Sequence, residues 1–345
     1  MNDSRKLMAG FAVMGAVDVV GVAKNYIQDQ FMLSDGIAGF IPSACYLWFL
    51  LLSVPFARAA STFGRRRVSM AGFLLSFVSL SIPVMLKGSL CATLASMAFL
   101  GIGTTAVMVA FNPFVQDVVG PDRLSRTMLF GQGTKSLTAI AIPMLLPLFA
   151  LTASGWQGAL AVLGLTGLLG AFFLHTMKVE EAPSASVGLR SAVHLLCRKK
   201  MLLCFLAGAL IVAADVCVMA CAPRIMQTRT GLDLNQSTFL TVAYPLAKTA
   251  VAFLGGALLG RIGENRFLAG SIVLALSGIA LLAFASSRVL IIGSLVLFAA
   301  GYTNLFSIVF SKALRAFPDR SDAVSSLMIM SLCGGGAVLP LINLF

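Results

Sequence analysis

Apolar stretches of about 20 residues recur along almost the whole length of this 345-residue chain. A helix of that length crosses a hydrocarbon core about 30 Å thick, whereas a membrane barrel strand takes about ten residues and alternates polar with apolar side chains. Because these stretches are apolar all round, the sequence predicts an all-α, polytopic membrane protein with about eleven transmembrane helices. The expected spans are 7–31, 37–57, 68–87, 90–115, 127–152, 156–177, 199–225, 235–260, 266–286, 287–311 and 323–345.

Two short sequences recur 197 residues further along the chain and indicate a duplication. Ala-Val-Asp-Val at 16–19 is matched by Ala-Ala-Asp-Val at 213–216, and Pro-Asp-Arg at 121–123 recurs at 318–320. The aspartates of the first match therefore occupy equivalent places in two copies. Ionisable residues inside membrane spans face a cavity or a partner, so this pair marks a central site.

The chain turns polar at 178–198, between the sixth and seventh expected spans. This break predicts an N-terminal bundle at 1–177 with helices 1–6, a cytoplasmic linker at 178–198, and a C-terminal bundle at 199–345 with helices 7–11. Parallel repeats of six helices, each with nested inverted units of three, are an arrangement that transporters use.

The net charge of +12 is distributed very unevenly between the two sides of the membrane. Most of the 25 lysines and arginines fall at the N-terminus and in the loops after the even-numbered helices. Positive-inside bias makes that side cytoplasmic, and attraction to anionic lipid explains the charge more simply than nucleic-acid binding. We expect a multi-pass protein of the inner (cytoplasmic) membrane with a cytoplasmic N-terminus. The opposite side carries only Lys24, Lys87, Arg224, Arg229 and Arg288.

The loop after the second span carries Gly64, Arg65 and Arg66, and a similar Gly-containing basic loop, 261–266, follows the eighth span. This loop resembles the Gly-Arg-Arg signature of the major facilitator superfamily. The glycine and aspartate at the front of the family's signature fall on Ala57 and Ser61 here. The charge relay usually ascribed to the loop therefore lacks its usual acid.

Three further segments resemble the fucose, galactose and glucose proton symporters of that superfamily. They are 101–121, with Gly-Ile-Gly, Asn-Pro-Phe and Gly-Pro, then 301–306, Gly-Tyr-Thr-Asn-Leu-Phe, and 327–336, which ends in three glycines. The resemblance implies the major facilitator fold and a monosaccharide carried inward with a proton by alternating access. That fold has twelve helices, and the chain as given ends at the eleventh expected span. Helix 12 would then be missing, from a shortened product or in an eleven-helix native form.

Asp18 is the leading candidate for proton coupling. A carboxylate in mid-membrane costs about 2.5–3.5 kcal/mol on insertion scales, so an unpaired one should face a water-filled cavity or a partner. Burial favours the protonated form of a carboxylic acid, and its ionised form accepts hydrogen bonds from hydroxyl groups. In the resembled family an acid of the first helix has this kind of role, and Asp18 falls on it. The alternative is an aspartate bonded to a neighbouring helix for structure alone.

Asp215 occupies the place equivalent to that of Asp18 in the second copy, and it has two interpretations. It either faces the cavity or pairs with a lysine, Lys248 of the eighth span or Lys135 of the fifth. Lys135 can lie near enough to the cytoplasmic face to extend its ammonium to the interface. Lys248 is about halfway along its span and is expected in the interior.

The resemblance also shows a departure in the fourth span. The sugar symporters can carry an acid four residues before the Asn-Pro pair, and here that place is Met108. The protein then couples through Asp18 alone, moves its solute without protons, or is a binding or sensor protein without transport. Asn112, Gln116 and Asn304 are candidate hydroxyl partners, because an amide offers both donors and an acceptor. A helix–helix hydrogen bond is the alternative for each.

Aromatic rings would supply the other half of a sugar site by stacking on the apolar face of the sugar. Trp48 ranks first because it lies well inside its span, and Tyr46, Tyr244 and Tyr302 follow. Packing or anchoring at the membrane interface is the alternative for each of them.

Enzyme signatures in the chain are superficial. Gly-Ile-Gly at 101–103 lies inside an apolar span with no preceding strand, and the loop 131–136 has a threonine between the glycine and lysine of a phosphate-loop pattern. Both are better explained by close helix packing. None of the seven cysteines forms a C-x-x-C pair. We expect no enzyme, no cofactor and no metal, but a monomer in a lipid bilayer whose partners are a sugar and a proton.

Overall fold

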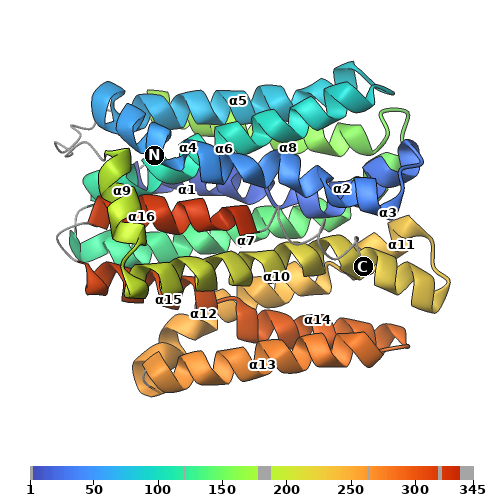
Figure 1. Ribbon diagram of the computed structural model, residues 1–345. Coiled ribbons are helices and arrows are strands. Elements are labelled where there is room, and N and C mark those ends of the chain that lie inside the picture. The colour runs from blue at the N-terminus through green and yellow to red at the C-terminus, as the bar shows by residue number, and fades with distance from the viewer. Residues whose placement is uncertain (1–2, 120, 178–187, 263, 318–320, 335–345) are drawn as a thin grey trace.

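The computed structural model is a helical bundle and describes residues 3–119, 121–177, 188–262, 264–317 and 321–334 (Figure 1). Nine helices in this part of the chain are long and apolar enough to cross a membrane. The all-α membrane fold expected from the sequence is confirmed. The expected spans 235–260 and 323–345 are not among the nine: in the first, the side chains of 253 and 255–260 lie outside the described set, and the second runs beyond residue 334.

The N-terminal half contains eight helices. In chain order their bounds are α1 Asp3–Ala16, α2 Val19–Gln30, α3 Asp35–Gly39, α4 Ile41–Phe63, α5 Arg65–Met85, α6 Leu90–Val119, α7 Pro121–Ala150 and α8 Trp156–His175. Of these, α1, α5, α6 and α8 pack closely around one another. Figure 1 shows them running almost antiparallel along one axis. We call the end of the bundle where α1 begins the N-terminal face, and the other end the opposite face.

The second half repeats this pattern of long helices. Its elements are α9 Leu189–Leu196, α10 Lys199–Thr230, α11 Leu234–Leu240, α12 Ala243–Ile262, α13 Glu264–Phe284, α14 Arg288–Tyr302, α15 Leu305–Ala316, α16 Ser321–Met330 and a 3₁₀ turn at Ser331–Cys333. Helix α9 lies within the segment expected to be a plain linker. Ala192 and Leu195 of α9 are buried in an apolar cluster with α10, α15 and α16, which explains why this part of the segment folds.

Several expected spans consist of two helices with a short break. The breaks lie at 17–18, 241–242 and 303–304, whereas α10 is continuous through Asp215. At the first break Asp18 N donates to Gly15 O at 3.2 Å, three residues back rather than four. Irregular backbone at membrane depth occurs where protein buries it or where it lines a cavity. The breaks therefore direct attention to the middle of the bundle.

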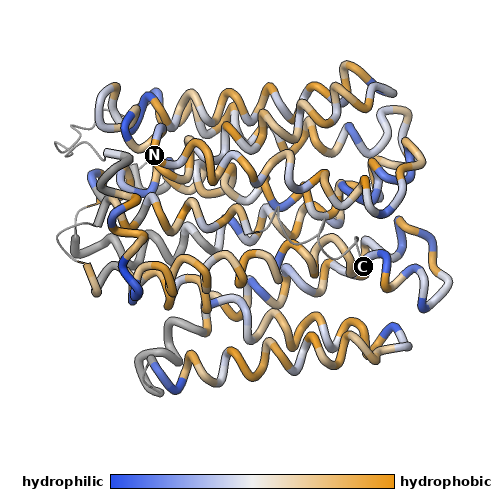
Figure 2. The backbone as a smooth tube through the Cα atoms, in the orientation of Figure 1, coloured by the Kyte–Doolittle hydropathy of each residue, from blue (hydrophilic) through white to orange (hydrophobic). Residues whose placement is uncertain are grey.

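Glycines bring the helices of the first half into close contact. A Cβ built on Gly103 of α6 would lie 2.9 Å from the carbonyl oxygen of Gly72 on α5, and one on Gly101 would meet the backbone of Cys45. This confirms that the Gly-Ile-Gly sequence serves helix packing rather than nucleotide binding. Figure 2 shows the apolar residues that run along the outside of α5 and α13, as expected for surfaces that face lipid.

Candidate functional site

Asp215 forms the centre of a polar cluster in the C-terminal half. It lies on α10, and Lys248 of α12 donates hydrogen bonds to both of its carboxylate oxygens at 3.0 Å. The Tyr244 hydroxyl donates to the same carboxylate. Pairing in this way offsets the cost of placing both charges inside a membrane bundle. Of the two lysines that the sequence left open as partners of Asp215, the structure brings Lys248 to it.

Aromatic rings enclose the Lys248 ammonium. Its nitrogen is 5.3 Å from the ring centroid of Tyr244 and 5.2 Å from that of Tyr302, both within the range of cation–π attraction. Phe298 lies between these two tyrosines, with centroid distances of 5.8 and 5.4 Å and nearly parallel planes. The result is a row of three stacked rings from α12 and α14 beside a fixed ion pair.

Asp18 lies at the α1–α2 break and has a different environment. Among the described residues no hydrogen bond or ion pair to its carboxylate is found. Three charged side chains act on it electrostatically: Lys135, Lys248 and Asp215. The two aspartates are therefore near the same centre, but one is held by partners and the other is not.

Tyr46 of α4 joins this centre from the N-terminal half. It is buried, and both Asp18 and Asp215 act electrostatically on its hydroxyl. Trp48, which ranked first from the sequence, is half-buried two residues further along, and no ring or hydrogen-bond contact is found for it in the described part. The aspartates therefore interact with Tyr46, Tyr244 and Tyr302. Among the described residues no such interaction is found for Trp48, which ranked first from the sequence.

The three candidate amides differ in their surroundings. Asn112 donates to the carbonyl of Met108 on its own helix at 3.1 Å. Asn304 lies at the α14–α15 break, and its buried amide nitrogen has no hydrogen-bond partner among the described residues. The side chain of Gln116 lies outside the described set. Asn304 therefore retains an unused donor, whereas the Asn112 donor is at least partly used within its helix.

The basic loop after α4 forms a tight link at the N-terminal face. Gly64 has φ 95°, a conformation that favours glycine, and it allows α5 to begin at Arg65. Arg65 donates to both oxygens of Asp117 at 2.8 and 2.6 Å, and Arg66 donates to the His175 carbonyl at 2.7 Å. The acid that the loop itself lacks is thus provided by α6, 52 residues further along the chain.

Hydrogen bonds between the two halves close the opposite face. Asn25 of α2 donates to the Ala220 carbonyl of α10 at 2.9 Å. Arg224, one turn further along α10, forms an ion pair with Asp29 and donates to the Asn25 carbonyl at 3.3 Å. Together with the Tyr26 hydroxyl, which donates to Asn235 at 3.1 Å, these contacts join α2 to α10 and α11. None of these contacts was predicted from the sequence, because each joins residues about 200 positions apart.

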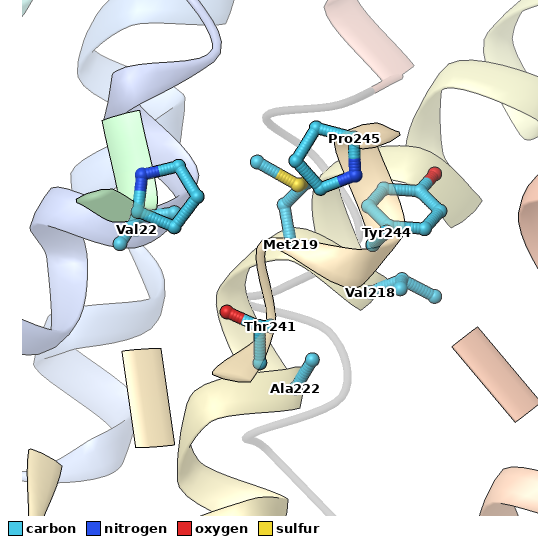
Figure 3. A pocket seen from close by; sticks show the side chains of 8 residues that line it. Val22, Val218, Met219, Ala222, Thr241, Tyr244 and Pro245 are labelled. Atoms are coloured by element: carbon cyan, nitrogen blue, oxygen red, sulfur yellow. The ribbon is translucent and has the colours of Figure 1, made fainter. Parts of the chain in front are cut away.

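A small void lies beside the α11–α12 break (Figure 3). Thr241 and Tyr244 line it, and its remaining lining is apolar: Val22, Pro143, Val218, Met219, Ala222 and Pro245. Tyr244 also donates to Asp215, so this void adjoins the central cluster.

Known proteins match the chain over nearly its whole length. The profile of the Major Facilitator Superfamily matches residues 7–340. A candidate glucose/galactose transporter of Helicobacter pylori strain J99 is 24% identical over 359 residues, which cover 97% of this chain and 86% of the relative. Multidrug resistance protein MdtL of Klebsiella pneumoniae strain 342 is also 24% identical, over 307 residues that cover 85% and 76% of the two chains.

Solved structures share the fold. The crystal structure of a variant of the Escherichia coli fucose:proton symporter FucP superposes with a TM-score of 0.73 and 17% identity, covering 99% of this chain and 91% of that one. At this identity the likeness concerns the arrangement of helices alone.

Proposed function

Because this chain belongs to the major facilitator superfamily and is a transporter of that type rather than an enzyme, we propose that it carries a neutral monosaccharide inward together with a proton. The observation that supports this most is the contrast between the two aspartates. Asp215 is fixed by Lys248 and Tyr244, whereas Asp18 has no partner among the described residues. A buried carboxylic acid without a hydrogen-bond partner is the group that can take up and release a proton during a cycle.

The same centre offers what a sugar needs. The rings of Tyr244, Phe298 and Tyr302 provide flat apolar surfaces, and the Asn304 amide keeps an unused donor. Ionised Asp18 would accept hydrogen bonds from sugar hydroxyls, and protonated Asp18 would donate one. Binding of the proton and of the sugar would then influence each other through one carboxyl group.

Alternating access requires the two halves to separate at one face at a time. We assign the N-terminal face to the cytoplasm, since positive-inside bias favours it. The opposite face is closed by a few neutral hydrogen bonds and one partly exposed ion pair, worth together about 2–4 kcal/mol. A barrier of that size suits a gate that a bound solute can open, because a ligand shifts an equilibrium only by its differential affinity for the two states.

The test is transport by the purified protein in vesicles. Internal pH is followed while D-glucose, D-galactose, L-fucose and D-xylose are added one at a time. We expect acidification with at least one sugar and its loss in Asp18→Asn. Asp233→Asn is the matched control, because that exposed carboxylate only caps α11 and asparagine caps helices equally well. Full sugar-linked proton movement in Asp18→Asn would contradict the assignment of Asp18.

A second candidate function is movement of a different small solute, or uncoupled movement. Met108, buried beside Asn112, occupies the place where the resembled symporters can carry an acid. In addition, one relative is named as a multidrug resistance protein. Sugar uptake without pH change would support uncoupled movement, and pH change with cationic dyes but with no sugar would support a drug transporter.

A further inference from the structure

A polar groove opens on the opposite face, between the ends of α2 and α3 on one side and α10 on the other. Its polar lining comes from both halves of the protein: Gln28, Asp29, Asp35, Arg224, Gln227 and Thr228. Arg224 of this lining also donates to the Asn25 carbonyl, and Asn25 itself donates to Ala220 of the other half. The central site described above does not use any of these groups.

One buried group that lines this groove lacks a hydrogen-bond partner, and a charged group one turn away on α2 has no protein partner among the described residues. The Gln28 side chain donates to Asp35 at 2.6 Å, but its buried carbonyl oxygen has no partner among the described residues. Lys24, one turn earlier on the same face of α2, is 5% exposed, and the described part of the chain shows no hydrogen bond or ion pair to its ammonium. An unmatched buried polar group costs about 1–3 kcal/mol, more when it is charged. A ligand that satisfies both groups would recover that free energy.

The pattern of unmatched groups indicates the chemistry of the ligand. Lys24 offers donors only and Gln28 Oε1 accepts only, and a hydroxyl group can serve either of them because it both donates and accepts. The charges around the groove balance, because Lys24 and Arg224 are opposed by Asp29 and Asp35, and the thiols of Cys217 and Cys221 are the remaining titratable groups near Lys24. A balanced set favours a neutral, hydroxyl-rich solute over an anion or a cation.

We propose that the groove is a loading site at which a neutral polyhydroxylated solute binds between α2 and α10 before the opposite face opens. The inference rests on the proposed function, since it names where the transported sugar first binds. Arg224 and Asp29 form part of the groove wall and also link the two halves. Solute hydroxyls that compete for these two side chains would weaken the link and favour opening toward the central site.

The test measures occupancy of the groove directly. Thr228, exposed on the groove wall, is changed to cysteine, and Gln236→Cys, exposed on α11 outside the groove lining, is the matched control. The proteins are held in lipid nanodiscs and labelled with a maleimide, and the labelling rate at each position is read by peptide mass spectrometry. D-glucose and D-galactose are the neutral probes, with gluconate and glucosamine as charged probes of similar shape.

We expect a neutral hexose to slow labelling at 228 but not at 236, and to do so equally in the Asp18→Asn background. Gln28→Met keeps the length of the side chain but removes the unmatched acceptor together with the donor to Asp35, and should raise the hexose concentration for half-protection by about fivefold or more. Circular dichroism and gel filtration check that the variant is folded. If Gln28→Met does not fold, Lys24→Met is measured in its place. This variant removes the second unmatched group and should weaken protection in the same way.

The proposal is overturned by any of four results. These are no protection by either hexose, protection that Asp18→Asn abolishes, protection that neither Gln28→Met nor Lys24→Met weakens, and stronger protection by gluconate or glucosamine than by the neutral sugars. The vesicle assay separates this outcome from failure of the proposed function. Sugar-linked proton movement without protection at 228 refutes the loading site alone, whereas protection without transport refutes only the transport mechanism.

Discussion

The Asp215–Lys248 pair should show a large energetic coupling, which a double-mutant cycle can measure. The charged atoms are 3.0 Å apart, and the two side chains are only 14% and 15% exposed. At an effective dielectric constant of about 20, charges at this distance attract by about 5 kcal/mol before desolvation is subtracted. The net contribution of the pair to stability will be smaller, because removing both charges also removes both desolvation penalties, whereas these penalties cancel in the coupling.

Each single variant leaves a different group without its partner. Lys248→Met leaves the Asp215 carboxylate without a counter-charge and with tyrosine hydroxyls as its remaining partners, and should destabilise the protein by about 3–5 kcal/mol. Asp215→Asn leaves the Lys248 ammonium between two tyrosine rings, whose attraction retains about 2 kcal/mol, so about 2–3 kcal/mol should be lost. The double variant should be destabilised by only about 1–2 kcal/mol, which makes the coupling about 3–7 kcal/mol.

Unfolding is followed by far-ultraviolet circular dichroism as sodium dodecyl sulfate is titrated into mixed micelles. The control is the same cycle on Asp29 and Arg224, whose side chains are 46% and 26% exposed, and its coupling should be at most about 1 kcal/mol. Additive effects of Asp215→Asn and Lys248→Met, with coupling below about 0.5 kcal/mol, would refute the buried pair. A coupling at the control pair equal to that at the buried pair would refute the role of burial.

Three further outcomes are expected. Gly103→Ala should destabilise the protein by about 1–3 kcal/mol in the same titration, because the added carbon meets α5. Gly293→Ala is the control and should be neutral or slightly stabilising, because the space around Gly293 is open. Equal effects of the two variants would contradict the close α5–α6 contact. Tyr302→Phe should keep the row of stacked rings and raise the sugar concentration for half-maximal uptake by less than about fivefold. Tyr302→Ala should raise that concentration about tenfold or more. Similar values for both variants would exclude stacking of the sugar on the Tyr302 ring. Asp117→Asn should cost about 1–3 kcal/mol through loss of the charged pair with Arg65, and a heat-inactivation curve unchanged from the original would refute that contact.

The fold was predictable from the sequence because each membrane span has to satisfy its own backbone hydrogen bonds, and this makes long apolar stretches reliable. The pairing of side chains across the bundle was not. Lys135 and Lys248 were both candidate partners of Asp215, and only the three-dimensional structure shows that the Lys248 side chain of α12 reaches Asp215 on α10. Arg65 and Asp117 lie on different helices with no shared local pattern, so nothing in the loop signature indicated an acid on α6. The break at Asp18 was also hidden, since no proline marks that position.

The Asn25 bond to α10 has a consequence for how the closure tolerates mutation. Its acceptor is the backbone carbonyl of Ala220, and every amino acid supplies that group. Many side chains can therefore replace Ala220 without loss of the hydrogen bond, provided they fit the space, whereas position 25 needs a side-chain donor of the same length. Random mutagenesis should find that few substitutions are tolerated at position 25, whereas those at position 220 are limited only by side-chain size. Two residues in contact would therefore tolerate very different sets of substitutions.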